Sequence, residues 1–172
     1  MSVAFVLSGG GSLGSIQVGM LHALYERDIR PDFFVATSVG AINAAFVASR
    51  PPTVDTIRQL EAVWHGVRRA DVFPADLLTG FLGFTGYRRA LVPNRELRHL
   101  VARNMLASRL EETATPLHVI AVDLSTGGER RLSEGTLLDA VLASTAIPAV
   151  FEPVAWRGED LADGGVANNT PI

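Results

Sequence analysis

The stretch Val35–Ala44 reads VATSVGAINA, and it sets a single hydroxyl group between two apolar segments. An apolar run leads up to Ser38, and a helix-like run of apolar and small residues follows it at once. Small residues, Ala36 and Gly40, stand two positions to either side. This pattern is typical of a tight strand–serine–helix turn, in which larger flanking side chains would collide with neighbouring backbone. Ser38 is therefore a candidate nucleophile; the alternative is that it only caps the helix.

A glycine-rich loop lies earlier in the chain, between another predicted strand and another predicted helix. Val3–Leu7 is short and continuously apolar, which predicts a strand buried on both faces. Ser8–Gly14 follows as SGGGSLG, and apolar residues then recur at helical spacing from Ile16 to about Arg27. Backbone N–H groups in such a loop point at an anion near a helix N-terminus. We therefore expect an anion-binding site here.

Two kinds of anion fit this loop. Gly9, Gly11 and Gly14 match the glycine fingerprint of dinucleotide-binding oxidoreductases. Such a site also needs an acidic residue at the end of the second strand to hold the ribose, but Thr37–Val39 occupies that place. The oxyanion of an acyl-transfer intermediate needs only N–H donors. We favour the oxyanion interpretation and keep the dinucleotide-binding oxidoreductase as the weaker alternative.

A nucleophilic serine needs a base, and the candidate is Asp163. It stands in Ala-Asp-Gly-Gly after the last apolar segment, so it is expected beyond the end of a strand, as Ser38 is. The alternative is an ordinary Asp-Gly turn. A Ser–Asp–His order is not supported, because no histidine follows Asp163. The histidines fall within or near predicted helices and strands: His22, His65, His99 and His118.

The remaining segments alternate between helices and strands, which predicts an α/β layered fold with a mainly parallel central sheet. Thr136 and Asp139 resemble a capping box at the start of one helix. The predicted helices are Val39–Ala48, Val54 to Trp64, a helix capped by Asn94 and reaching about Met105, and Leu137 to about Thr145. The predicted strands are Phe33–Thr37, Leu117–Val122, Glu129–Leu132, Val154–Trp156 and Asp160–Ala162.

Composition limits the possible functions. The chain has 172 residues, 48% of them hydrophobic, which fits one domain, 1–172, with a sizeable core. A net charge of −3 gives no electrostatic reason to expect nucleic acid, and the absence of cysteine excludes disulfides and thiolate metal sites. We see no metal site, no signal peptide and no run near the ~20 apolar residues of a membrane span, so we expect a cytoplasmic protein. Pro171 resembles the first turn of a further helix, so we expect the natural chain to continue past Ile172.

The segment Phe73–Tyr87 combines glycines with aromatic and aliphatic residues. Its apolar side chains are candidates for contact with substrate or, peripherally, with a membrane surface. The alternative is that they pack beneath a long loop.

Taken together and in order, three segments resemble the signature motifs of the patatin-like phospholipases: Gly9–Gly14, Thr37–Asn43 and Asp163–Gly165. Ala143–Pro148, followed by Phe151–Val154, resembles that family's block ahead of its aspartate. The resemblance covers nearly the whole chain. It implies a three-layer α/β/α sandwich and a Ser–Asp dyad that hydrolyses acyl esters of lipids, with no cofactor and no metal.

The resemblance also implies a role for each motif residue. Ser38 becomes the nucleophile and Asp163 the base. The sequence departs from the family pattern at Leu13, where an Arg or Lys is frequent, and at Ala36, where a glycine is usual. These departures motivate a third hypothesis beside the hydrolase and the oxidoreductase: a catalytically silent binding or regulatory module. The sequence does not indicate the oligomeric state. The other implied site residues are the oxyanion loop Gly9, Gly10, Gly11, Ser12 and Gly14, the elbow residues Ala36 and Gly40, and Gly164 and Gly165 after the base.

Overall fold

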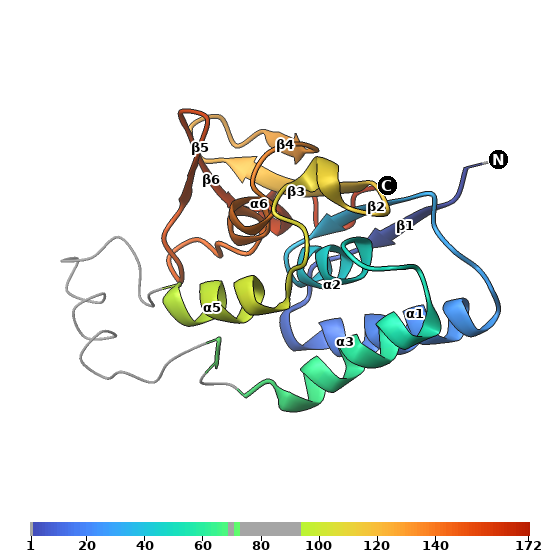
Figure 1. Cartoon of the computed structure of the whole chain (residues 1–172). Helices are drawn as coiled ribbons and strands as arrows, with labels where there is room; N and C mark the ends of the chain where they lie inside the picture. Colours follow the sequence, from blue (N-terminus) through green and yellow to red (C-terminus); the bar gives the residue numbers. More distant parts are fainter. Residues whose placement is uncertain (1, 69–70, 73–93) are drawn as a thin grey trace.

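The computed structural model describes residues 2–68, 71–72 and 94–172, which form an α/β sandwich around one mixed sheet (Figure 1). The segment Phe73–Tyr87 lies outside the described residues. The strands are β1 (Ala4–Leu7), β2 (Phe33–Thr37), β3 (Leu117–Asp123), β4 (Glu129–Leu132), β5 (Val154–Trp156) and β6 (Glu159–Asp163). The helices are α1 (Gly14–Glu26), α2 (Val39–Ala48), α3 (Val54–Gly66), α5 (Arg95–Asn104) and α6 (Leu137–Ser144), with short 3₁₀ turns η1 (Gly11–Leu13), η3 (Leu110–Glu112) and η4 (Gly164–Val166).

The predicted elements are confirmed in the described part of the chain, apart from shifts of a few residues at their ends. The capping-box prediction for α6 is wrong. Thr136 does precede the helix, but its side chain makes no cap hydrogen bond. Asp139 instead pairs with Arg98 on α5 at 3.1 Å, so its carboxylate links two helices. Asn94 likewise precedes α5 without a side-chain cap bond.

The sheet brings two distant strand ends together. β1, β2 and β3 are parallel, and β4 lies antiparallel along one edge of β3. The other edge of β3 is shared by β2, which pairs with its first half, and by antiparallel β6, which pairs with its second half. Thr37 at the end of β2 lies opposite Ile120, and Asp163 at the end of β6 lies opposite Ala121. The two strands therefore meet end to end, with both carboxyl ends at the middle of β3.

Helix α2 occupies the centre of the protein. Nearly all of its residues are buried, and it contacts β1, β2, β3, α1, α3 and α6. Alanines at 41, 44, 45 and 48 are fully buried, and their small side chains allow this close approach. Figure 1 shows α1, α3 and α5 on the same side of the sheet as α2. Among the described residues, no helix has both the length and the hydropathy needed to span a membrane.

Candidate active site

Ser38 lies at the turn between β2 and α2 in a strained conformation, with φ 53° and ψ −125°. Such a backbone costs a non-glycine residue about 1–3 kcal/mol and persists only where the surroundings enforce it. The Ser38 N–H donates to Ser144 Oγ at 2.8 Å, and the Ser144 hydroxyl donates to the carbonyl of Ile120 on β3. Ala41 N–H donates to Ser38 O at 2.8 Å. The turn is thus fixed from both sides.

The two small residues beside Ser38 have different roles. A Cβ at Gly40 would overlap the carbonyl groups of Leu7 and Ser8, so only glycine lets α2 approach the end of β1 this closely. The methyl group of Ala36 is instead fully buried in the hydrophobic core. The core therefore has room for the methyl group at this position.

We expect Gly40→Ala to lower the free energy of unfolding by about 3 kcal/mol, because the new methyl would meet backbone atoms that cannot rotate away. Urea unfolding followed by circular dichroism measures the change. Gly19→Ala is the matched control: nothing lies within 4 Å of the added Cβ, so we expect a gain of about 0.5–1 kcal/mol. Equal stability of the two variants would contradict the close contact at Gly40.

The Asp163 carboxylate contacts the Ser38 hydroxyl. Ser38 Oγ donates to Asp163 Oδ2 at 2.7 Å, and Gly165 N–H donates to Asp163 Oδ1 at 2.7 Å. Asp163 is buried, and burial raises its pKa, while the bonds from Ser38 and Gly165 oppose the rise. A Cβ at Gly164 would overlap the carbonyl of Ile120, so glycine is required where the chain leaves β6. The result is a hydroxyl paired with a desolvated carboxylate, a more basic group than an exposed one.

The glycine loop lies directly beside this pair. A Cβ added to Gly9 would come within 3.2 Å of Ser38 Cβ, and Gly9 N–H donates to Asn169 O at 3.1 Å. Within the described ranges, the N–H groups of Gly10, Gly11 and Ser12 have no acceptor, and all three residues are exposed. These free donors near the Ser38 hydroxyl have the chemistry of an anion site.

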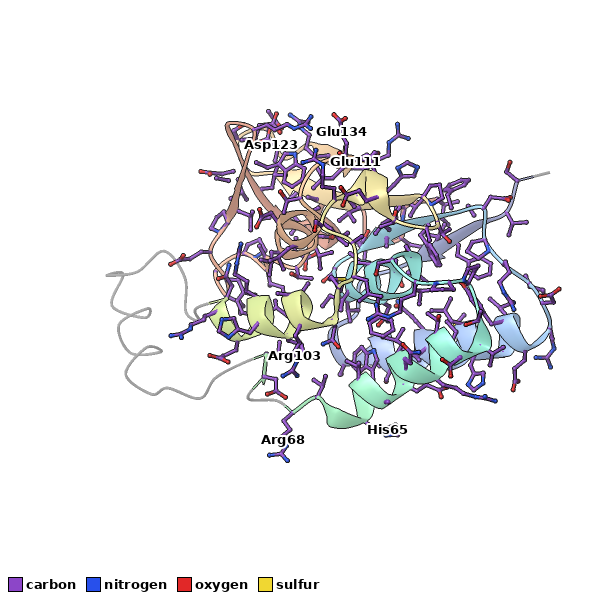
Figure 2. The ribbon with its side chains drawn as sticks, viewed as in Figure 1. His65, Arg68, Arg103, Glu111, Asp123 and Glu134 are labelled. Carbon is purple, nitrogen blue, oxygen red and sulfur yellow. The ribbon has the colours of Figure 1, made fainter. Side chains whose placement is uncertain are left out.

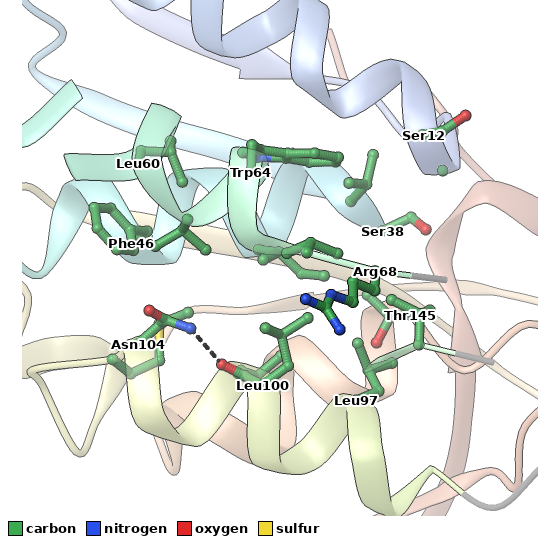
Figure 3. A pocket seen from close by; sticks show the side chains of 18 of the residues that line it. Ser12, Ser38, Phe46, Leu60, Trp64, Arg68, Leu97, Leu100, Asn104 and Thr145 are labelled. Atoms are coloured by element: carbon green, nitrogen blue, oxygen red, sulfur yellow. Dashed lines mark hydrogen bonds between the residues drawn. The ribbon is translucent and has the colours of Figure 1, made fainter. Parts of the chain in front are cut away.

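An apolar cavity of about 410 Å³ opens at Ser38 and runs between α2, α3 and α5. Figure 3 shows Ser12 and Ser38 toward one end and Phe46 and Leu60 toward the other. Among its described lining residues the one charged side chain is Arg68, which is exposed and is labelled in Figure 2 and in Figure 3. The other lining side chains are mostly apolar: Val39, Ile42, Val63, Trp64, Val67, Val72, Leu97, Leu100, Val101, Met105, Ile147 and Phe151.

Ser144 and Asn43 lie inside the motif segments Ala143–Pro148 and Thr37–Asn43, but the sequence pattern assigned neither residue a role. Both have 0% exposure; Asn43 lies on α2, whose other residues are apolar or small, and Ser144 is the last residue of α6. For Asn43, a polar side chain inside an apolar helix was the available signal. In the described residues, no three His, Asp or Glu side chains are grouped as metal ligands.

The chain is similar to known proteins over nearly its whole length. The family model of the patatin-like phospholipases matches residues 5–172. The chain is 28% identical to mouse patatin-like phospholipase domain-containing protein 7, 26% to lysophospholipase nte1 of Aspergillus terreus and 26% to neuropathy target esterase sws of Drosophila persimilis, in each case over 99% of this chain. It spans only 12%, 11% and 12% of those proteins.

The fold is also that of a solved structure. VipD from Legionella pneumophila superposes with a TM-score of 0.67 over 99% of this chain and 47% of that chain, at 16% sequence identity. At this level of identity the match establishes a shared fold.

Proposed function

Because the chain belongs to the patatin-like phospholipase family, whose model matches residues 5–172, we propose that it is a serine acyl hydrolase that cleaves acyl esters of lipids. Relatives named lysophospholipase and esterase support this reaction class. The observation that carries the proposal is the 2.7 Å hydrogen bond from Ser38 Oγ to Asp163 Oδ2 at the mouth of an apolar cavity.

The proposed reaction uses an acyl-enzyme. Asp163 accepts the hydroxyl proton while Ser38 Oγ attacks the ester carbonyl carbon. The resulting oxyanion accepts hydrogen bonds from the free N–H groups of Gly10, Gly11 and Ser12, and the N-terminus of α2 adds its positive dipole. The carbon–oxygen bond breaks, and the leaving alkoxide takes the proton from Asp163. Water, deprotonated by Asp163, then releases the fatty acid and restores the Ser38 hydroxyl.

The cavity beside Ser38 is proposed to hold the acyl chain, because its walls are almost wholly apolar. We expect Leu60→Phe, a change at the end remote from Ser38, to lower kcat/KM for a palmitoyl ester by about tenfold or more relative to a butyryl ester. The p-nitrophenyl esters of both acids measure this ratio, and thermal unfolding controls for overpacking. An unchanged chain-length profile would place the acyl chain elsewhere.

Fluorophosphonate labelling tests the proposed function directly. The probe phosphonylates activated serines, so we expect labelling that mass spectrometry assigns to Ser38, together with hydrolysis of palmitoyl lysophosphatidylcholine. A folded protein that stays unlabelled and inactive would be the silent binding module that Leu13 and Ala36 motivated. Tight NAD binding by calorimetry would instead support the dinucleotide alternative.

A further inference from the structure

A buried amide on α2, the helix that follows Ser38, connects both ends of the glycine loop to that helix. Asn43 has 0% exposure, and its Nδ2 donates to Gly14 O at 2.9 Å and to Gln17 Oε1 at 3.0 Å. Gln17 Nε2 in turn donates to Ser8 O at 2.7 Å. The first residue of the loop and its last residue are therefore held, directly or through Gln17, by one side chain.

The same amide reaches the wall of the cavity. Trp64 Nε1 donates to Asn43 Oδ1 at 2.9 Å, and Trp64 lines the cavity (Figure 3). Gly14, the last residue of the loop, packs tightly against Val39 and Trp64: a Cβ at this position would come within 2.5 Å of Val39 Cγ2 and 2.9 Å of the Trp64 ring. Every polar atom of the Asn43 side chain thus has a partner. A fully satisfied buried network of this kind is rigid, and loss of one member leaves buried groups unpaired.

We propose that Asn43 is a positioning residue that holds the N–H groups of Gly10, Gly11 and Ser12 in place relative to Ser38. It follows Ser38 by five residues on α2, a rise of roughly 7.5 Å, and it contacts none of the reacting groups. Oxyanion donors act only when they lie about 2.7–3.1 Å from the developing charge, and a misplacement of about 1 Å can cost ~100-fold in rate. This inference rests on the proposed function, because the positioned donors matter only if Ser38 forms an acyl-enzyme.

Asn43→Asp is the decisive variant. It keeps the side-chain shape and an acceptor for Trp64, but it replaces the donor to Gly14 and Gln17 with an oxygen. We expect kcat for a p-nitrophenyl ester to fall by about 100-fold with KM little changed. The affinity for a trifluoromethyl ketone, whose adduct with Ser38 places an oxyanion at the loop, should fall by a similar factor. The affinity for an alkanol of the same chain length, which fills only the cavity, should stay the same, whereas general loosening would weaken both ligands.

Two further variants keep the inference testable if Asn43→Asp does not fold. Gln17→Met, at a half-buried position, removes the bond to Ser8 O and the acceptor for Asn43 Nδ2 but leaves the bond from Asn43 to Gly14 O, so we expect a smaller fall in kcat and in ketone affinity, about tenfold. Thr56→Val removes a buried hydroxyl that donates to Pro51 O at 2.6 Å, remote from the loop, and should leave both values unchanged. Folded Asn43→Asp or Gln17→Met proteins with wild-type kcat and wild-type ketone affinity would overturn the inference.

Hydrogen exchange separates this inference from the proposed function. If the wild-type protein neither hydrolyses esters nor binds the ketone, the proposed function fails. The positioning role is then read from peptides that span Ser8–Gly14: faster exchange in Asn43→Asp than in Thr56→Val supports it, and equal exchange overturns it.

Discussion

Ser38→Ala is expected to abolish ester hydrolysis and fluorophosphonate labelling, with a loss in kcat of about 10⁴-fold or more. The hydroxyl is the group that contacts the buried carboxylate and opens onto the apolar cavity. The fold should remain intact, because the backbone bonds that hold the turn come from Ser144 and Ala41 and do not involve the Ser38 hydroxyl. Hydrolysis of p-nitrophenyl butyrate and of lysophosphatidylcholine measures the loss, and circular dichroism checks the fold.

Ser49→Ala is the control for this result. Ser49 follows α2 at its other end, and its hydroxyl donates to Ala45 O at 2.7 Å, far along the helix from the reacting groups. We expect wild-type labelling and activity from this variant. A Ser38→Ala protein that still hydrolyses esters at the wild-type rate would remove Ser38 from the mechanism.

Asp163→Asn is expected to lower kcat by about 10³- to 10⁴-fold, because an amide cannot take the proton of Ser38. The amide can still accept the bond from Gly165, so the local backbone should be preserved. Asp160→Asn, an exposed change on the same strand, is the matched control and should leave kcat unchanged. Comparable rates for the two variants would exclude Asp163 as the base.

The pH dependence of stability gives a second readout for Asp163. Burial raises its pKa in the folded state, so its contribution to stability is fully present below the unfolded pKa and is lost as pH rises through the folded pKa. At neutral pH the ionised, desolvated carboxylate therefore opposes folding. At pH 7 we expect the unfolding temperature of Asp163→Asn to equal or exceed that of the wild type. Under acid conditions any excess should disappear, because the wild-type carboxyl is then protonated and uncharged. Differential scanning calorimetry across the acid range measures the difference.

Activity should depend on pH in the opposite direction from the contribution of Asp163 to stability: it should fall, not rise, as the pH is lowered. The base must be ionised to act, so kcat/KM should fall as pH decreases through the raised pKa of Asp163. The residual activity of Asp163→Asn should lack this acid limb. A wild-type profile that stays flat through the acid range would contradict a carboxylate base.

The strands and helices in the described part were predictable because each is encoded by local periodicity and by glycine or proline at its ends. The layered α/β class follows from their alternation. The pairing of β6 was not predictable in this way: its antiparallel register with β3 is a long-range contact that no local pattern encodes. The Thr136 capping box failed for a similar reason, because Arg98 from another helix takes the Asp139 carboxylate.

The candidate site was partly accessible from the sequence. Short motifs indicated Ser38, Asp163 and the glycine loop, and the structure places them in contact with one another. Their chemical roles stay predictions until the variants are measured. The motif segments contained Ser144 and Asn43 but indicated no role for either, because their hydrogen-bond partners lie on other elements and are known only from the structure.

The end-to-end meeting of β2 and β6 has a consequence for biosynthesis. The two strands have no ladder in common, and only β3 aligns them. Asp163 follows Ser38 by 125 residues, so a ribosome has made the nucleophile long before the carboxylate emerges. If Asp163 is the base, as proposed, Ser38 lacks it until β6 has paired with β3, so docking of the last strand completes the proposed pair.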